Sequence, residues 1–341
     1  MNFKNILVVR TDRIGDVILT TPAFKALRLA YPEAKISLLV SSVTYPLVFQ
    51  NPYVNEILMV DREGRHNGFW GFWKLVFEIR KRKFDLAVIY HTKRWTNWLV
   101  YFAGIPARCG YKDKHAGSLL TIPVEDHRYL GEVHESQYCL DLLKVLGVEQ
   151  GDLELHISID PAAQQWAEKF WKDKFKEGKK KVLFHVGASD PGKVWPAEYF
   201  VQLINMVKQE WNAVCVLVGN FEAQHKAEII IKQCSDVVDL TSQTSVSQLV
   251  SLIKQSDILI SNDSGPIHIA AALNAPVVAI FVRNQPGINP ERWYPLGEKS
   301  LFIAPPKDMS VSFLKAGDGE SVYLKKITPE EVFPIIKKLI I

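Results

Sequence analysis

The sequence is poor in cysteine and lacks long apolar runs. Its 341 residues include four cysteines, Cys109, Cys139, Cys215 and Cys234. None lies in a C-x-x-C pair or has a closely spaced histidine, which argues against a disulfide framework or a zinc site and suits a reducing compartment. No stretch reaches the roughly 18 apolar residues of a membrane span, and no signal peptide is recognisable. We therefore expect a cytoplasmic protein.

Further absences narrow the function. The sequence has no G-x-G-x-x-G fingerprint, which argues against a nicotinamide-dependent dehydrogenase. No D-x-D pair that resembles a metal site follows a predicted strand. The net charge of +4 is too small to predict a nucleic-acid partner, and no short repeat suggests a solenoid.

The sequence does contain two series in which short β-branched runs alternate with longer helical patterns. Such alternation predicts right-handed βαβ units and a parallel sheet in each half. The predicted strands are 6–9, 35–40, 56–60, 86–89, 182–186, 214–218, 237–240, 258–260 and 277–281. The predicted helices are 16–30, 45–50, 69–82, 94–103, 196–210, 222–233, 246–254, 266–273 and 329–341.

A polar helical segment between residues 155 and 181 separates the two series. We expect an N-terminal domain over residues 1–160, a second domain over 161–325, and a C-terminal helix over 326–341 with Thr328 as N-cap. Residues 287–322 are rich in Pro and Gly and are expected to be loop. The predicted fold class is α/β, with two Rossmann-like doubly wound domains facing a central cleft. Ligands bind such sheets at the carboxyl ends of the strands.

The loop after the first strand contains "RTDRIGDVILTTPAFKAL", residues 10–27. Gly15 permits close approach of a ligand, and Asp16 stands where a helix begins. Asp16 either caps this helix or serves as a general base at the cleft.

The segment "HVGASDPGKVWPAEYF", residues 185–200, resembles a P-loop. Gly187, Gly192 and Lys193 have the P-loop spacing, but Val194 stands where a P-loop has the Ser or Thr that holds magnesium. Lys193 either reaches a phosphate as a point charge or lies exposed in a turn.

The segment "SNDSGPIHIAAALNAPVVAIF", residues 261–281, joins a strand to a helix. Asp263, Ser264 and Gly265 precede Pro266, which suits the first helical turn. Free amides at such a helix start bind anions, and Ser264 can donate to a phosphate oxygen. His268 either faces the same anion or is a packing residue.

Glu222 follows the predicted strand at 214–218. Its carboxylate either accepts hydrogen bonds from a ribose diol or favours the helix dipole at a helix start.

Four of these stretches together resemble glycosyltransferase family 9, the bacterial heptosyltransferases of lipopolysaccharide core assembly. They are "ILVVRTDRIGDVILTTPAFKAL", "GASDPGKVWPAEYF", "LTSQTS" and "SNDSGPIHIAAALNAPVVAIF". The resemblance implies a GT-B fold, with the acceptor on the N-terminal domain and a nucleotide sugar on the C-terminal domain. It also implies that the last helix packs back on the N-terminal domain. Family members use ADP-heptose and a glycolipid acceptor, invert the anomeric centre and need no obligatory bound metal or other cofactor.

The resemblance also implies residue roles. Asp16 would be the base, and Lys193, the amides at Ser264 and Gly265, and His268 would stabilise the leaving diphosphate. Asp263 would orient this loop and Glu222 would hold the ribose. The remaining implied residues are Thr241 and Ser242 for the adenosine pocket, and Lys93, Arg94 and Arg108, which are either acceptor-binding residues or plain surface charges.

At two places the sequence departs from the pattern of the family, and both bear on the identity of the donor. Ser242 stands where relatives often have Gly, and Phe281 is followed by "VRNQPGINPERWYPLGE" where many relatives have Gly. One alternative is therefore a transferase for another nucleotide sugar and glycan. Two others are a magnesium-dependent P-loop hydrolase, which the spacing of Gly187 and Lys193 together with Asp263 favours, and a binding protein without turnover.

The segment "NGFWGFWKLVFEIRKRK", residues 67–83, places aromatic residues before a basic cluster. It is either a peripheral helix at the cytoplasmic face of the inner membrane or a core-facing helix with a basic end.

Overall fold

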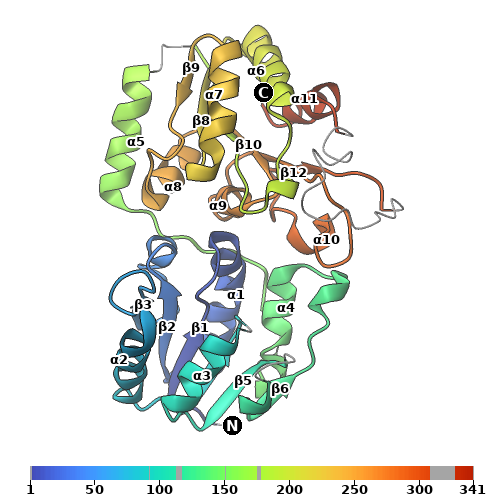
Figure 1. The fold of residues 1–341 in the computed structure, drawn as a ribbon. Helices are drawn as coiled ribbons and strands as arrows, with labels where there is room; N and C mark the ends of the chain where they lie inside the picture. The colour runs from blue at the N-terminus through green and yellow to red at the C-terminus, as the bar shows by residue number, and fades with distance from the viewer. Residues whose placement is uncertain are drawn as a thin grey trace. The chain divides into compact units, whose positions relative to one another are not determined.

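The computed structural model describes residues 2–91, 93–112, 117–149, 151–174, 178–307 and 327–340. The chain forms two compact units, Met1–Ser158 and Ile159–Ile341. The boundary follows residue 158, whereas the sequence predicted it after residue 160. Each unit contains a parallel sheet of six strands with helices packed on it (Figure 1).

In the first unit the strand order is β3-β2-β1-β4-β5-β6. The strands are β1 (Asn5–Val9), β2 (Lys35–Ser41), β3 (Glu56–Val60), β4 (Leu86–Ile89), β5 (Ala107–Tyr111) and β6 (Ile122–Val124). The helices are α1 (Ile14–Ala30), α2 (Gly68–Arg80), α3 (Arg94–Phe102) and α4 (Glu135–Asp141). Central strands are almost entirely buried because helices cover both faces of a parallel sheet.

The strand order of this sheet reverses between β1 and β4. From β1 the chain crosses over through α1 to β2, whereas β4 joins the other side of β1. Helices α2 and α3 pack on the face that carries Leu7 and Val9, and α1 packs against α4. The loops that follow β1 and β4 therefore lie side by side at the carboxyl edge, where open α/β sheets bind ligands.

The second unit has the strand order β12-β11-β10-β7-β8-β9. Its strands are β7 (Lys181–His185), β8 (Val214–Val218), β9 (Val237–Asp239), β10 (Ile258–Asn262), β11 (Val277–Ile280) and β12 (Ser300–Ile303). Its helices are α5 (Pro161–Lys174), α6 (Ala197–Trp211), α7 (Gln224–Gln233), α8 (Val246–Lys254), α9 (Gly265–Ala272), α10 (Pro290–Trp293) and α11 (Pro329–Lys337). Its switch point lies between β7 and β10, so the loops after these two strands are neighbours.

Several elements differ from the sequence prediction. The helix predicted over 45–50 is a single 3-10 turn, Tyr45–Leu47. Strands β5, β6 and β12 and helix α4 were not predicted, because they are short and lack a long periodic apolar pattern. The predicted loop over 287–322 contains α10 and β12, and its part from 308 onward lies outside the described residues.

Helix α11 packs on the second unit. Its apolar face, which includes Val332 and Ile336, belongs to the same hydrophobic core as α6. Phe333 lies against Trp211, with ring centroids 5.4 Å apart, and the Trp195 indole donates to the Ile327 carbonyl at 2.8 Å. The sequence predicts that this helix packs back on the N-terminal domain, whereas its apolar face is buried against α6 of the second unit.

Candidate active site

In the first unit, a buried guanidinium organises the carboxyl edge beside β1. Arg10 follows β1 directly, and its side chain is 1% exposed. It donates to Asp16 Oδ1 at 2.8 Å, to Glu135 Oε1 at 3.2 Å and to the carbonyl of Tyr90 at 3.2 Å. Asp12 Oδ1 also lies 3.2 Å from Arg10 Nε. Three carboxylates from two distant parts of the chain thus meet one buried cation.

Burial, with a smaller contribution from the neighbouring carboxylates, sets the acidity of Asp16. Burial raises the pKa of Asp16 from 3.8 to about 6; Arg10 opposes the rise, and Asp12 and Glu135 add to it. Burial likewise raises the pKa of Asp12. A carboxylate that exchanges its proton near neutrality is suited to general-base catalysis.

Asp16 is not the cap of its helix. Arg13 occupies the N-cap position of α1, and Asp16 lies in the first turn with its side chain turned to Arg10. The side chain of Asp16 keeps 17% of its surface exposed. Of the two readings of this residue, the geometry therefore favours the general base.

The predicted acceptor residues do not all lie at this edge. Lys93 and Arg94 are exposed at the start of α3, after β4, on the carboxyl side of the sheet. Arg108 lies near the amino end of β5, in register with Ala87 of β4. Its guanidinium donates to backbone carbonyls of Leu119 at 2.6 Å and Ile105 at 2.5 Å. The structure thus does not bring Arg108 together with Asp16.

Sequence reasoning missed most partners of Asp16. Arg10 and Asp12 lie in the same loop as Asp16, directly after a buried strand. Their charge at that place was the signal that could have identified them. Glu135 lies far along the chain at the start of α4, which itself was not predicted. Arg128 lies 4.0 Å from Glu135 and over the Tyr111 ring, 4.2 Å from its centroid.

In the second unit, the loops after β7 and β10 are tied together. Lys193 Nζ donates to Asp263 Oδ2 at 2.5 Å. The Asn262 side chain accepts from the Trp195 amide at 2.9 Å and donates to the Gly187 carbonyl at 3.0 Å. Burial raises the pKa of Asp263, and Lys193 opposes that rise. The residues predicted from two separate motifs thus form one cluster.

The geometry around Lys193 differs from that of a P-loop. A 3-10 turn, Pro191–Lys193, follows the loop, and α6 begins at Ala197. Asp190 accepts from the Gly192 amide at 2.9 Å and pairs with Arg283 Nη1 at 2.7 Å. Arg283, which the sequence analysis did not single out, therefore adds a second cation beside Lys193.

The segment after β10 has the expected helix start. Ser264 is the N-cap residue of α9, with Pro266 in the first turn. The Ser264 hydroxyl lies 3.0 Å from Nδ1 of His185, a buried residue at the end of β7. Burial lowers the pKa of His185 to about 4, so its ring is neutral at physiological pH. His268 is buried within α9.

The residues predicted for the nucleoside follow β8 and β9. Thr241 is buried, and its hydroxyl donates to Asp239 Oδ1 at 2.7 Å. Ser242 has φ of +58°, a left-handed conformation that favours glycine, and its amide donates to the Gly219 carbonyl at 2.8 Å. Glu222 is exposed in the 3-10 turn after β8 and accepts from Asn220 Nδ2 at 3.2 Å. All of them lie on the carboxyl side of the second sheet.

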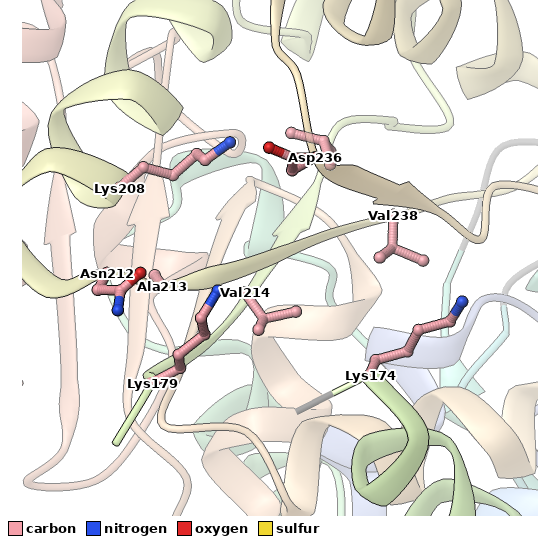
Figure 2. Close-up of a pocket in the computed structure, with 9 residues that line it drawn as sticks. Lys174, Lys179, Lys208, Asn212, Ala213, Val214, Asp236 and Val238 are labelled. Carbon is pink, nitrogen blue, oxygen red and sulfur yellow. The ribbon is translucent and has the colours of Figure 1, made fainter. Parts of the chain in front are cut away.

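A hollow elsewhere on the second unit contains none of these residues. Figure 2 shows three lysines, Lys174, Lys179 and Lys208, around it together with Asp236. Its volume is about 420 Å³, and it lies where β8 and β9 begin, at the amino edge of the sheet. It is therefore separate from the cluster around Lys193.

The described residues lack two kinds of feature. No helix in the described ranges is long and apolar enough to cross a membrane. Among these described residues, no group of three or more His, Cys, Asp or Glu side chains is placed so that it could hold a metal ion.

Comparison with known proteins extends over the whole chain. The model of glycosyltransferase family 9 (heptosyltransferase) matches residues 72–309. Lipooligosaccharide heptosyltransferase 2 of Haemophilus influenzae is 25% identical, over 98% of this chain and 99% of that protein. Lipopolysaccharide heptosyltransferase 2 of Escherichia coli K12 is 26% identical, over 98% of each.

Solved structures show the same fold. A family 9 glycosyl transferase from Veillonella parvula superimposes with a TM-score of 0.84 at 24% identity, over 99% of this chain and 97% of that one. The E. coli ADP-heptose lipopolysaccharide heptosyltransferase II superimposes with a TM-score of 0.77 at 23% identity, over 98% of each chain. The predicted fold class, two Rossmann-like domains of the GT-B type, is confirmed. The family model covers well over half of the chain, and the chain therefore belongs to glycosyltransferase family 9, the heptosyltransferase family.

Proposed function

We propose that this glycosyltransferase moves a heptose from ADP-heptose to a hydroxyl of a lipopolysaccharide core or a similar glycolipid. The observation that carries the proposal is the Asp16 carboxylate, held by Arg10 and poised with a pKa of about 6. Support for the substrates comes from full-length relatives named lipooligosaccharide and lipopolysaccharide heptosyltransferases, and from the E. coli structure named for ADP-heptose.

In the proposed reaction, Asp16 takes the proton of the acceptor hydroxyl while that oxygen attacks the anomeric carbon. The bond from the anomeric carbon to the diphosphate breaks, and its electron pair leaves with ADP. A single displacement of this kind inverts the anomeric centre. Arg10 fixes the direction of the carboxylate, and burial keeps it basic enough to accept the proton.

We assign the donor to the second unit. Lys193, the amides at Ser264 and Gly265, and His268 would stabilise the charge that develops on the diphosphate, without an obligatory metal. Asp263 would hold Lys193 in place through the 2.5 Å contact. The remaining proposed donor residues are Glu222 for the ribose, and Thr241 and Ser242 for the adenosine.

For the acceptor, we retain Lys93 and Arg94 as candidates, since both are exposed on the carboxyl side of the first sheet. A phosphorylated or acidic glycan would complement them. Arg108 is left out because its guanidinium is bound to backbone carbonyls at the other edge. We also propose that the enzyme acts at the cytoplasmic face of a membrane, where a glycolipid acceptor resides.

Thermal stabilisation by ADP, UDP and GDP, each with EDTA and with magnesium, tests the donor. A ligand at a hundred times its Kd stabilises the fold by about 2.7 kcal/mol. We expect ADP to raise the melting temperature equally in EDTA and in magnesium. A preference for UDP or GDP would keep the transferase and change the donor, as the departures at Ser242 and after Phe281 allow. A shift that requires magnesium would contradict the metal-free proposal.

A further inference from the structure

Helix α2 leaves an aromatic face uncovered. One side of this helix, including Leu75, Val76 and Ile79, is buried in the core of the first unit. On the other side, Trp70 is 82% exposed, and Phe69 and Phe77 are 66% and 55% exposed. A helix that covers a sheet needs one apolar face, so these rings are not required for packing.

These rings form a continuous surface with α3. Ring centroids are 5.3 Å apart for Phe69 and Trp70 and 6.2 Å apart for Trp73 and Phe77. Trp73 also contacts Phe102 of α3 at 5.0 Å, and Tyr101 of α3 is exposed. Trp73 itself is partly buried against the core, and we call the exposed rings around it, Phe69, Trp70, Phe77 and Tyr101, the aromatic face. Large contiguous apolar surfaces of this kind mark binding sites.

Basic side chains are interleaved with the aromatic face. Trp70, Lys74, Phe77 and Lys81 follow one another at helical spacing of four, three and four residues, and all four are exposed. Residues 62–83 contain seven basic and two acidic residues, while the whole chain has a net charge of only +4. One of the two acids, Glu78, is paired with Arg65. Arg82 is likewise paired with Glu56. The exposed lysines Lys74 and Lys81 therefore place positive charge beside the aromatic face.

From this juxtaposition we propose that the aromatic face of α2 binds the surface of an anionic phospholipid bilayer. Aromatic rings would lie at the level of the headgroups, and the lysines would extend to the lipid phosphates. An anionic membrane complements the charge excess, because each Lys or Arg near such a surface adds attraction.

The position of the face fits a glycolipid acceptor. Helix α2 begins after β3, so Phe69 and Trp70 lie on the carboxyl side of the first sheet, the same side as Asp16 and Arg94. A membrane bound there would present its lipid-linked sugars to the end of the unit that carries the base. In this respect the inference deepens the proposed function and rests on it.

Co-sedimentation with vesicles of phosphatidylcholine, with and without phosphatidylglycerol, tests the proposal. We expect binding only to the anionic vesicles, weakened by salt. The pair Trp70→Ala with Phe77→Ala should lower the partition coefficient at least about tenfold, since two large apolar side chains leave the interface. The pair Lys74→Gln with Lys81→Gln should lower it by about fivefold per lysine.

Two matched controls use exposed residues away from the face. Leu29→Ala removes another exposed apolar side chain, and Lys169→Gln with Lys172→Gln removes two lysines from the exposed side of α5. Both should bind vesicles like the wild type. Every substituted side chain is exposed, so all variants should melt at the wild-type temperature, and a melt confirms that a loss of binding is not a loss of fold.

Activity separates this inference from the proposed function. The aromatic variants should transfer sugar more slowly to an acceptor embedded in vesicles but normally to a short water-soluble acceptor, with ADP affinity unchanged. The inference would be overturned if the aromatic variants bound vesicles as well as the wild type does. It would also be overturned if the wild type did not bind anionic vesicles. A dimer that the aromatic variants dissociate while vesicle binding persists would overturn it too. If ADP does not bind at all, the proposed function fails while the vesicle result still stands on its own.

Discussion

Replacement of Asp16 by asparagine should lower the rate of sugar transfer and, above about pH 6, raise the stability of the fold. The substitution keeps the size of the side chain and leaves an oxygen that can accept from Arg10, now 2.8 Å from Oδ1. It removes the proton acceptor that we propose for the acceptor hydroxyl. A positioned general base contributes about 10²–10⁴-fold to the rate. We therefore expect kcat to fall by at least about a hundredfold with ADP affinity unchanged.

The stability effect follows from the direction of the pKa shift. Burial raises the pKa of Asp16 from 3.8 to about 6, so the folded state disfavours the ionised carboxylate. Below pH 3.8 the group is protonated in both states and contributes nothing. As the pH rises from 3.8 to about 6 the folded state keeps a proton that the unfolded state has lost, so stability falls across this window and the loss is complete above about 6. A shift of about two pKa units corresponds to about 3 kcal/mol. Asp16→Asn should recover about that much above pH 6 and nothing at low pH.

The assay is sugar transfer together with thermal unfolding at about pH 8 and about pH 4. In the wild type, kcat/KM should rise with pH up to about 6 and then level off, because the base must be ionised. Asp152→Asn is the control: this exposed carboxylate pairs with Lys25 outside the cluster, and its loss should leave the rate unchanged. Transfer by Asp16→Asn within about threefold of the wild type would refute the assignment of the base.

Three further predictions concern other parts of the two units. Lys193→Gln should weaken ADP binding, measured by calorimetry in EDTA, at least about tenfold. It should also destabilise the fold at neutral pH, because the buried Asp263 carboxylate loses its partner. Unchanged ADP binding would remove Lys193 from the donor site. Arg108→Gln should lower the free energy of unfolding by about 1–3 kcal/mol without changing KM for the acceptor; a raised KM would restore its predicted role. Gly219→Ala places a Cβ 2.6 Å from the Ala223 methyl, and this clash should lower the free energy of unfolding by about 1–3 kcal/mol. Adding Ala223→Gly to the same protein removes that methyl and should reverse the loss, as measured by denaturant unfolding.

Much of the donor cluster could be anticipated from the sequence because its residues come in local motifs. The stretch from Asp263 to Pro266 combines a strand end, a glycine and a helix start within a few residues, and α9 begins at Gly265. What the motifs could not indicate is that Lys193 and Asp263 pair with each other. The two lie far apart in the chain, and only the parallel pairing of β7 with β10 brings their loops together.

The sequence by itself determined the alternation of buried strands and amphipathic helices, and with it the two parallel sheets and the positions of the loops at their carboxyl ends. Periodicity carries that information because burial repeats with the geometry of each element. Tertiary structure alone decided the surroundings of the side chains. It buried Arg10 among three carboxylates, turned Arg108 to backbone carbonyls, packed α11 on α6 and left Trp70 exposed. Such outcomes depend on contacts between residues that are distant in the chain, and no local pattern encodes which surface each of them meets.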